Sequence, residues 1–182
     1  MEKLEFVTAE PLGLTLNWRD GRIWEWRIVW AGAKRAVGCA PGRDAGASGE
    51  AQAEAAGRDA ADPSPAAKSL AQALARYAAG QEPHWPDLPL AWERLTPFAR
   101  EVLVAMREHT GPGRTLTYGQ LAALCGRPRA ARAVGRIMAR NPWPLVYPCH
   151  RVVGAGGKMV GFSAEGGIGL KRWLLGLEAG RE

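Results

Sequence analysis

The sequence has no Asp or Glu between His109 and Ala164, although seven Arg and one Lys lie in that interval. Residues 109–182 carry 11 basic and 3 acidic side chains, a net charge of +8, whereas residues 1–108 carry 13 and 15, a net charge of −2. A segment whose charges are almost all positive attracts polyanions, of which nucleic acid is the usual one. A solvated basic face is the alternative interpretation.

Cysteine is also scarce, and long apolar runs are missing. Cys39, Cys125 and Cys149 are widely spaced without a CxxC pair, which argues against a disulfide scaffold and a zinc site and favours the cytoplasm. No apolar run approaches the roughly 18 residues of a membrane span, and the N-terminus lacks a signal-peptide core. A hydrophobic fraction of 47% with eight Trp excludes wholesale disorder.

Alternating apolar and polar residues predict strands near the N-terminus. Leu12 to Trp18 and Arg22 to Trp30 flank Asp20-Gly21, a strong hairpin signal, and Ala33 to Cys39 could form a third strand. Residues 41–67 contain no aromatic residue and no aliphatic larger than Ala, so we expect a mobile insertion there, with a weak Ala-rich helix as the alternative. Lys68 to Ala79 is predicted as a helix that ends at Gly80.

The Pro-rich segment QEPHWPDLPL indicates a boundary between a domain of residues 1–90 and one of residues 91–182. The second domain is predicted to begin with a helix capped by Thr96, with Pro97 at its first position, running to about Glu108. Its inward residues would be Phe98, Val102, Ala105 and Met106.

Two short predicted helices, Thr117 to Cys125 and Arg129 to Arg140, flank Gly126-Arg127-Pro128 and form a helix-turn-helix outline. At 100° per residue, four arginines share a narrow stripe of the second helix, away from an apolar face. These arginines are Arg129, Arg132, Arg136 and Arg140. Small residues around them, including Ala131 and Gly135, allow close approach to a groove. A solvated amphipathic helix is the alternative, since Arg is a good helix former.

Cys149 follows directly, between Pro148 and His150. Three prolines are predicted to hold residues 141–148 extended, and Leu145 to Tyr147 to be buried. Basic neighbours can lower the pKa of a thiol and favour the nucleophilic thiolate. A lone Cys is more often a small buried hydrophobe, which is our prediction for Cys39 and Cys125.

These segments together resemble the O6-alkylguanine-DNA alkyltransferases, also called methylated-DNA–protein-cysteine methyltransferases. The resemblance rests on TPFAREVL, TYGQLAALCG, RAVGRIMARNPWPLVYPCHRVV and KRWLLGLE, which spread over roughly the last 90 residues. It implies an α+β fold, in which a small ribonuclease-H-like N-terminal α/β domain precedes a mainly helical domain with the helix-turn-helix and the active-site Cys.

The resemblance also implies a reaction and roles for residues. The protein would bind double-stranded DNA in the minor groove, flip O6-alkylguanine, and also O4-alkylthymine, out of the helix, and transfer the alkyl group irreversibly to Cys149. No cofactor or metal is needed, each molecule acts once, and a monomer is expected. His150 would act as base through a water and be oriented by Glu178, while Tyr118 protonates the leaving guanine and Asn141 ties the helix end to the active-site strand.

The DNA contacts and the pocket complete the implied site. Arg132 would occupy the gap left by the flipped base. The other expected DNA-contacting residues are Arg129, Arg136, Arg140, Arg151, Ala131 and Gly135, and the expected pocket residues are Val152, Phe162 and Ser163. The loop departs from the family pattern glycine-tyrosine-x-glycine-glycine, because Phe162 replaces Tyr and Ala164-Glu165 is extra.

Two other functions remain as alternatives. A non-enzymatic alkyltransferase-like lesion binder would usually lack the reactive Cys and the N-terminal part. A helix-turn-helix transcription factor would explain the arginine stripe but not PCHRV or Glu178.

Overall fold

The computed structural model describes residues 1–30 and 62–180, which belong to two compact units, Met1–Leu90 and Ala91–Glu182. The possible strand at residues 33–39, Cys39 and residues 41–61 of the predicted insertion lie outside the described residues.

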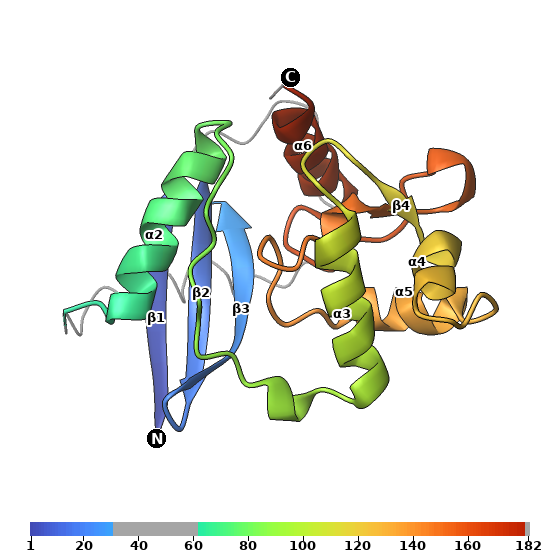
Figure 1. The fold of residues 1–182 in the computed structure, drawn as a ribbon. Helices are drawn as coiled ribbons and strands as arrows, with labels where there is room; N and C mark the ends of the chain where they lie inside the picture. The colour runs from blue at the N-terminus through green and yellow to red at the C-terminus, as the bar shows by residue number, and fades with distance from the viewer. Residues whose placement is uncertain (31–61, 181–182) are drawn as a thin grey trace. The chain divides into compact units, whose positions relative to one another are not determined.

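The N-terminal unit contains an antiparallel sheet in the order β1-β2-β3, formed by Glu2–Ala9, Leu12–Arg19 and Arg22–Trp30 (Figure 1). The predicted hairpin is confirmed as β2 and β3. Asp20 and Gly21 join them with φ values of 48° and 76°, the left-handed backbone that a two-residue hairpin turn requires. Alternate residues of both strands, such as Leu14 and Ile28, are buried.

Strand β1 was not expected from the sequence, because its core-facing positions hold Glu5 beside Val7. The structure shows why a carboxylate can be buried there. Glu5 Oε1 accepts a hydrogen bond from the Ser64 backbone N–H at 2.8 Å and Oε2 accepts one from Ser64 Oγ at 2.7 Å. Lys3 Nζ pairs with Oε1 at 2.8 Å. A buried acid with three donors is satisfied.

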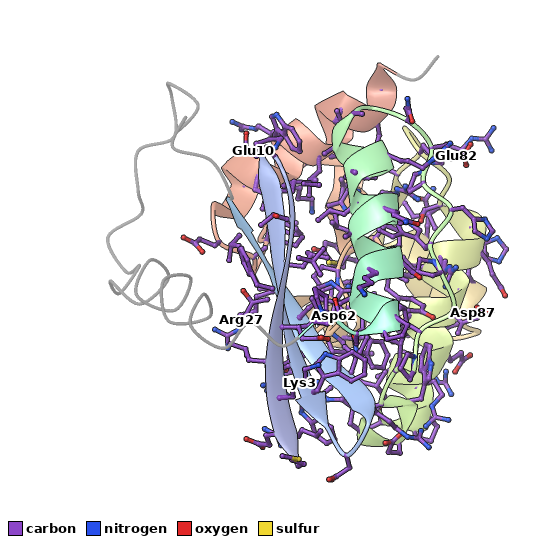
Figure 2. All side chains as sticks on the ribbon, turned by 90° about the vertical axis from the view of Figure 1, so that its left-hand side faces the viewer. Lys3, Glu10, Arg27, Asp62, Glu82 and Asp87 are labelled. Carbon is purple, nitrogen blue, oxygen red and sulfur yellow. The ribbon has the colours of Figure 1, made fainter. Side chains whose placement is uncertain are left out.

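Helix α2 spans Pro65–Ala78, so Pro65 to Ala67 are helical and were wrongly placed in the predicted insertion. The signal was present in the sequence: Ser64 caps the helix by accepting from the Ala67 N–H, and proline suits the first helical position. Asp62 and Glu82 mark the two ends of this helix, which lies along the sheet (Figure 2). Its predicted core residues Leu70, Leu74 and Tyr77 are buried.

The C-terminal unit is mainly helical, as expected from the sequence (Figure 1). Its helices are α3 (Pro97–His109), α4 (Tyr118–Leu124), α5 (Ala131–Ala139) and α6 (Gly167–Ala179). Short 3-10 turns are η1 (Trp92–Arg94), η2 (Cys149–Arg151) and η3 (Ala155–Gly157), and the two-residue strands β4 (Leu116–Thr117) and β5 (Val152–Val153) pair in parallel.

Thr96 caps α3 as predicted, by accepting a hydrogen bond from the Ala99 N–H. Val102 and Met106 are buried as expected, whereas Phe98 and Ala105 are half-buried. Leu103, which the sequence analysis did not place inward, is also buried. The core face of α3 is therefore rotated from the predicted one.

Residues 141–148 fold into bends and turns, so the prediction of an extended segment was wrong. The Tyr147 N–H donates to the Trp143 carbonyl at 2.9 Å, which closes a turn that the prolines flank rather than prevent. Leu145 to Tyr147 are buried as predicted, and Leu145 has a φ of 74°, in the left-handed region that favours glycine. Trp143 and Tyr147 pack edge-on against Trp92.

No helix in the two described ranges is long and apolar enough to cross a membrane. Within the same ranges, no group of three or more His, Cys, Asp or Glu side chains is placed to hold a metal ion.

Candidate active site

Helices α4 and α5 pack against each other and form the helix-turn-helix. Thr117 begins α4 with a capping box, in which its hydroxyl accepts from the Gln120 N–H at 3.1 Å and the Gln120 side chain accepts from the Thr117 N–H at 2.8 Å. Helix α5 begins at Ala131, two residues later than expected, because the turn after Gly126 continues through Arg129. Arg129 therefore lies before the helix and not on its stripe.

Three arginines remain on the exposed side of α5. Arg132 and Arg136 lie within the helix and Arg140 is its C-cap, and all three are exposed. Among the ion pairs of the described residues, none involves these three side chains, whereas the nearby Arg127 pairs with Glu101 at 2.6 Å. The opposite face of α5 buries Val134 and Met138. The helix thus packs with one face and presents cations with the other.

Cys149 begins the 3-10 turn η2, immediately before β5. The Cys149 N–H donates to the Tyr147 carbonyl and the Arg151 N–H to the Pro148 carbonyl, both at 2.9 Å. These bonds hold Cys149 in a fixed turn, with only 5% of its surface exposed. Cys125 is buried as well, as predicted.

His150 and Glu178 form a buried hydrogen-bonded pair, with His150 Nε2 and Glu178 Oε1 2.8 Å apart. Burial lowers the pKa of His150 despite the adjacent carboxylate, so the ring is neutral near pH 7. With Nε2 bonded to Glu178, Nδ1 is the ring nitrogen that remains to accept a proton. The pair has the geometry of a base and the acid that orients it.

Arg151 is part of this network, and its expected place on the DNA surface is revised. Its guanidinium donates from Nε to Glu178 Oε2 at 2.9 Å and from a terminal nitrogen to Oε1 at 3.0 Å. The other terminal nitrogen donates to the carbonyl of Thr110, the C-cap of α3. Burial raises the pKa of Glu178, but the hydrogen bonds and charges of His150 and Arg151 outweigh this effect and hold the pKa well below its usual range.

The pKa of the Cys149 thiol is raised, whereas the sequence suggested a lowered one. Burial is the main cause, since it disfavours the charged thiolate. A hydrogen bond from the Asn141 side chain and the charge of Lys171 act in the opposite direction. The free protein therefore holds a protonated thiol beside a neutral base.

Asn141 connects the end of α5 to the cysteine segment, as the resemblance implied. Its amide donates to the Tyr147 carbonyl at 2.7 Å, and its carbonyl accepts from the Trp143 N–H at 3.1 Å. Two backbone groups on the segment before Cys149 are thus fixed by one side chain. Both residues that it binds belong to the buried aromatic cluster.

Tyr118 reaches the site through the pairing of β4 with β5. Because Thr117 lies opposite Val153, the first residue of α4 follows directly beside the strand that leaves Cys149. Burial raises the pKa of Tyr118, and a negative charge on Cys149 adds to the shift, so its hydroxyl remains a proton donor. A Cβ added at Gly135 would lie 3.9 Å from the Tyr118 ring, so α5 passes the ring closely.

Lys171 is a member of the site that the sequence analysis did not single out. It is fully buried on α6, and its Nζ donates to the Val152 carbonyl at 2.6 Å and the Val160 carbonyl at 3.5 Å. A signal was available, because positions 171, 174 and 178 share one face of a helix, and Leu174 and Glu178 are buried on it.

The expected pocket residues differ in exposure. Val152 is fully buried, Phe162 is half-buried and Ser163 is exposed. The extra residues Ala164-Glu165 enter a turn closed by a hydrogen bond from the Gly167 N–H to the Ala164 carbonyl at 2.9 Å. The two extra residues therefore lie in the loop between Phe162 and the start of α6.

Comparisons with known proteins follow the same segments. The family model described as "6-O-methylguanine DNA methyltransferase, DNA binding domain" matches residues 97–180, which extend from α3 through α6. A methylated-DNA–protein-cysteine methyltransferase of Methanosarcina acetivorans is 40% identical over 111 residues, which cover 61% of this chain and 68% of the relative. The chain belongs to the methylated-DNA–protein-cysteine methyltransferase family.

Other members of this methyltransferase family extend the comparison. The Salmonella typhimurium protein is 51% identical over 80 residues, 44% of this chain, so the matched part spans 45% of that relative. The crystal structure of Mycobacterium tuberculosis O6-methylguanine methyltransferase superimposes with a TM-score of 0.68 at 30% identity, covering 100% of this chain and 95% of that chain. A structure of the same protein in complex with DNA matches with a TM-score of 0.66 at 30% identity, covering 97% and 93%. The α+β fold is thus that of the methyltransferase family.

Proposed function

We propose that this protein repairs DNA by transferring an alkyl group from O6 of guanine to the sulfur of Cys149, once per molecule. The observation that carries the proposal is the buried His150–Glu178 pair directly beside Cys149, in the unit that matches the family's DNA-binding domain. A helix-turn-helix regulator has no need for a buried base and its orienting acid next to a thiol.

The transfer is an in-line displacement. The thiol proton passes through a water to His150 Nδ1, the sulfur forms a bond to the alkyl carbon, and the bond from that carbon to O6 breaks. The electron pair remains on the guanine, which takes a proton from Tyr118 as it leaves. The imidazolium that forms is stabilised by Glu178, 2.8 Å from Nε2. The product thioether is stable, so the protein is consumed without a cofactor or metal.

Double-stranded DNA is the proposed partner, bound through its minor groove by α5. Arg136 and Arg140 would contact phosphates, together with Arg129 from the preceding turn, while Ala131 and Gly135 allow the close approach. Extruding a base costs a few kcal/mol, less for a damaged base, and Arg132 would fill the space it leaves. The exposed arginines of α5 support this assignment.

Asn141 would hold the cysteine segment in register with α5, and Val152, Phe162 and Ser163 would line the pocket for the flipped base. Phe162 can stack on a base but offers no hydroxyl. O4-alkylthymine is the second proposed substrate. The protein would act as a monomer in the cytoplasm, and the few, widely spaced cysteines support that compartment.

A duplex with one O6-[methyl-³H]methylguanine tests the proposal. We expect one equivalent of label on Cys149, located by peptide mass spectrometry, and none on a Cys149→Ser variant that still binds DNA. Cys125→Ser is the matched control, because its thiol is equally buried, and it should accept label normally. Arg132→Ala should bind DNA but transfer slowly. Persistent binding with all label left on the DNA would favour the lesion binder instead.

A further inference from the structure

The buried charges around Cys149 do not cancel. Glu178 carries one negative charge, which Arg151 matches through two hydrogen bonds. Lys171 adds a positive charge that is 0% exposed. Its two hydrogen-bond acceptors are backbone carbonyls, and it forms none of the ion pairs of the described residues. A buried ammonium ion without a neighbouring anion is costly, because buried charges are normally paired.

The ionisable groups around Cys149 come from three elements. Helix α6 supplies Lys171 and Glu178, η2 supplies His150 and Arg151, and α4 supplies Tyr118. Among them, the charge that acts on the thiol is that of Lys171, which favours the thiolate, and a thiolate in turn favours charged Lys171. Glu178 is occupied by its partners, and Tyr118 and the neutral His150 bring no cation.

The carbonyl contacts explain how the ammonium group is held in place. Val152 belongs to β5, directly after the turn that carries Cys149, and Val160 lies two residues before Phe162. The Gly154 N–H donates to the Lys158 carbonyl at 2.8 Å, so residues 154–158 form a tight turn between these two contacts. Lys171 is thereby fixed against the segment that leaves the cysteine.

We propose that Lys171 is a positioning residue for the alkyl transfer, a buried cation whose counter-ion is the Cys149 thiolate as it forms. The inference rests on Cys149 being the nucleophile of the proposed function. When the thiol passes its proton to His150, the new negative charge on Cys149 matches the positive charge of Lys171, while Glu178 remains hydrogen-bonded to Arg151 and His150. Burial opposes ionisation of the Cys149 thiol. It also strengthens the attraction between Lys171 and the thiolate, because the local dielectric constant is low.

Iodoacetamide provides a test that needs neither DNA nor repair. The rate of Cys149 alkylation is followed from pH 6 to 10 by mass spectrometry of the Cys149 peptide. Lys171→Met should move the pH midpoint upward by about one unit or more, which is roughly a tenfold slower reaction below the midpoint. Arg172→Met removes an exposed cation from the neighbouring position of α6 and should follow the wild-type profile. A folded Lys171→Met protein with the wild-type profile would overturn the proposal.

A reciprocal measurement covers the case in which Lys171→Met does not fold. With ¹⁵N-labelled lysine, the Lys171 amino group is titrated by NMR in the wild type and in Cys149→Ser. If the two groups are partners, the midpoint for Lys171 is lower in Cys149→Ser, because the anion is gone. Equal midpoints would overturn the proposal. If Cys149 takes up no label from DNA but Lys171 still affects the titration of Cys149, the result contradicts only the proposed function.

Discussion

The C-terminal unit uses the same kinds of cation in two opposite settings. On α5, Arg132 and Arg136 are exposed and belong to no ion pair of the described residues. At the cysteine, Arg151 and Lys171 are buried, and their side chains donate hydrogen bonds to the Glu178 carboxylate and to backbone carbonyls. Exposed cations contribute little to stability and are free to meet a phosphate, whereas buried cations are bound into the fold. What distinguishes the two sets is whether the side chains are buried, and not how far apart they lie in the sequence.

The largest difference between the sets should appear in stability. Arg151→Met removes one partner of a buried ion pair and leaves Glu178 with an unmatched charge, so we expect a loss of about 3–5 kcal/mol in the free energy of unfolding. Arg136→Met, the matched exposed change, should stay within about 0.5 kcal/mol of the wild type. Urea unfolding at pH 7 measures both. Equal losses in the two variants would remove the distinction drawn between the two settings.

The buried set should also make stability depend on acid pH. The folded-state pKa of His150 lies below its usual 6.5 and that of Glu178 below 4.5, so the unfolded chain takes up protons first as the pH falls. Stability is therefore present above these values and declines below about pH 6.5, then more steeply below about 4.5, by up to about 1.4 kcal/mol per pH unit for each proton.

The comparison for this prediction is Glu178→Gln, which is less stable at all pH values but should lose the steeper decline below about 4.5. Urea unfolding between pH 3 and 8 gives both curves. A wild-type slope in the variant would assign the acid sensitivity to other carboxylates.

The smallest effect is expected from the exposed set, in DNA affinity. Arg136→Ala should weaken binding of undamaged duplex and reduce the slope of log K against log salt by about 0.9, the loss of one phosphate contact. Arg172→Ala, an exposed cation on α6, should leave the slope unchanged. Fluorescence anisotropy at several salt concentrations measures both. An unchanged slope for Arg136→Ala would remove that residue from the proposed DNA surface.

Local sequence signals predicted most elements of the fold. The Asp20-Gly21 hairpin and the cap at Thr96 depend on neighbouring residues, and the structure has both of them. Strand β1 and the start of α2 were not predicted in this way. Burial of Glu5 in β1 depends on its bond to Ser64, 59 positions away, which no local pattern shows, whereas the start of α2 had a local signal, Ser64 followed by Pro65, that was missed.

The site was predictable as far as residue types went, but not in its electrostatics. Cys149, His150 and Glu178 were found from their motifs, and the structure brings the last two together. Basic neighbours suggested a lowered pKa for Cys149, yet burial, which depends on the whole unit, dominates. Arg151 looked like one more cation for DNA because its partners, Thr110 and Glu178, are distant in sequence.

The position of α6 along the chain has a consequence for biosynthesis. Chains are made and begin to fold from the N-terminus, at about 5–20 residues per second. Glu178 follows His150 by 28 positions, and Lys171 lies on the same late helix. A ribosome therefore translates the cysteine before the acid and the ammonium group that complete its surroundings. During that interval Cys149 of the nascent chain is an ordinary thiol. Lys171 and Glu178 join its surroundings only when α6 packs against the rest of the unit.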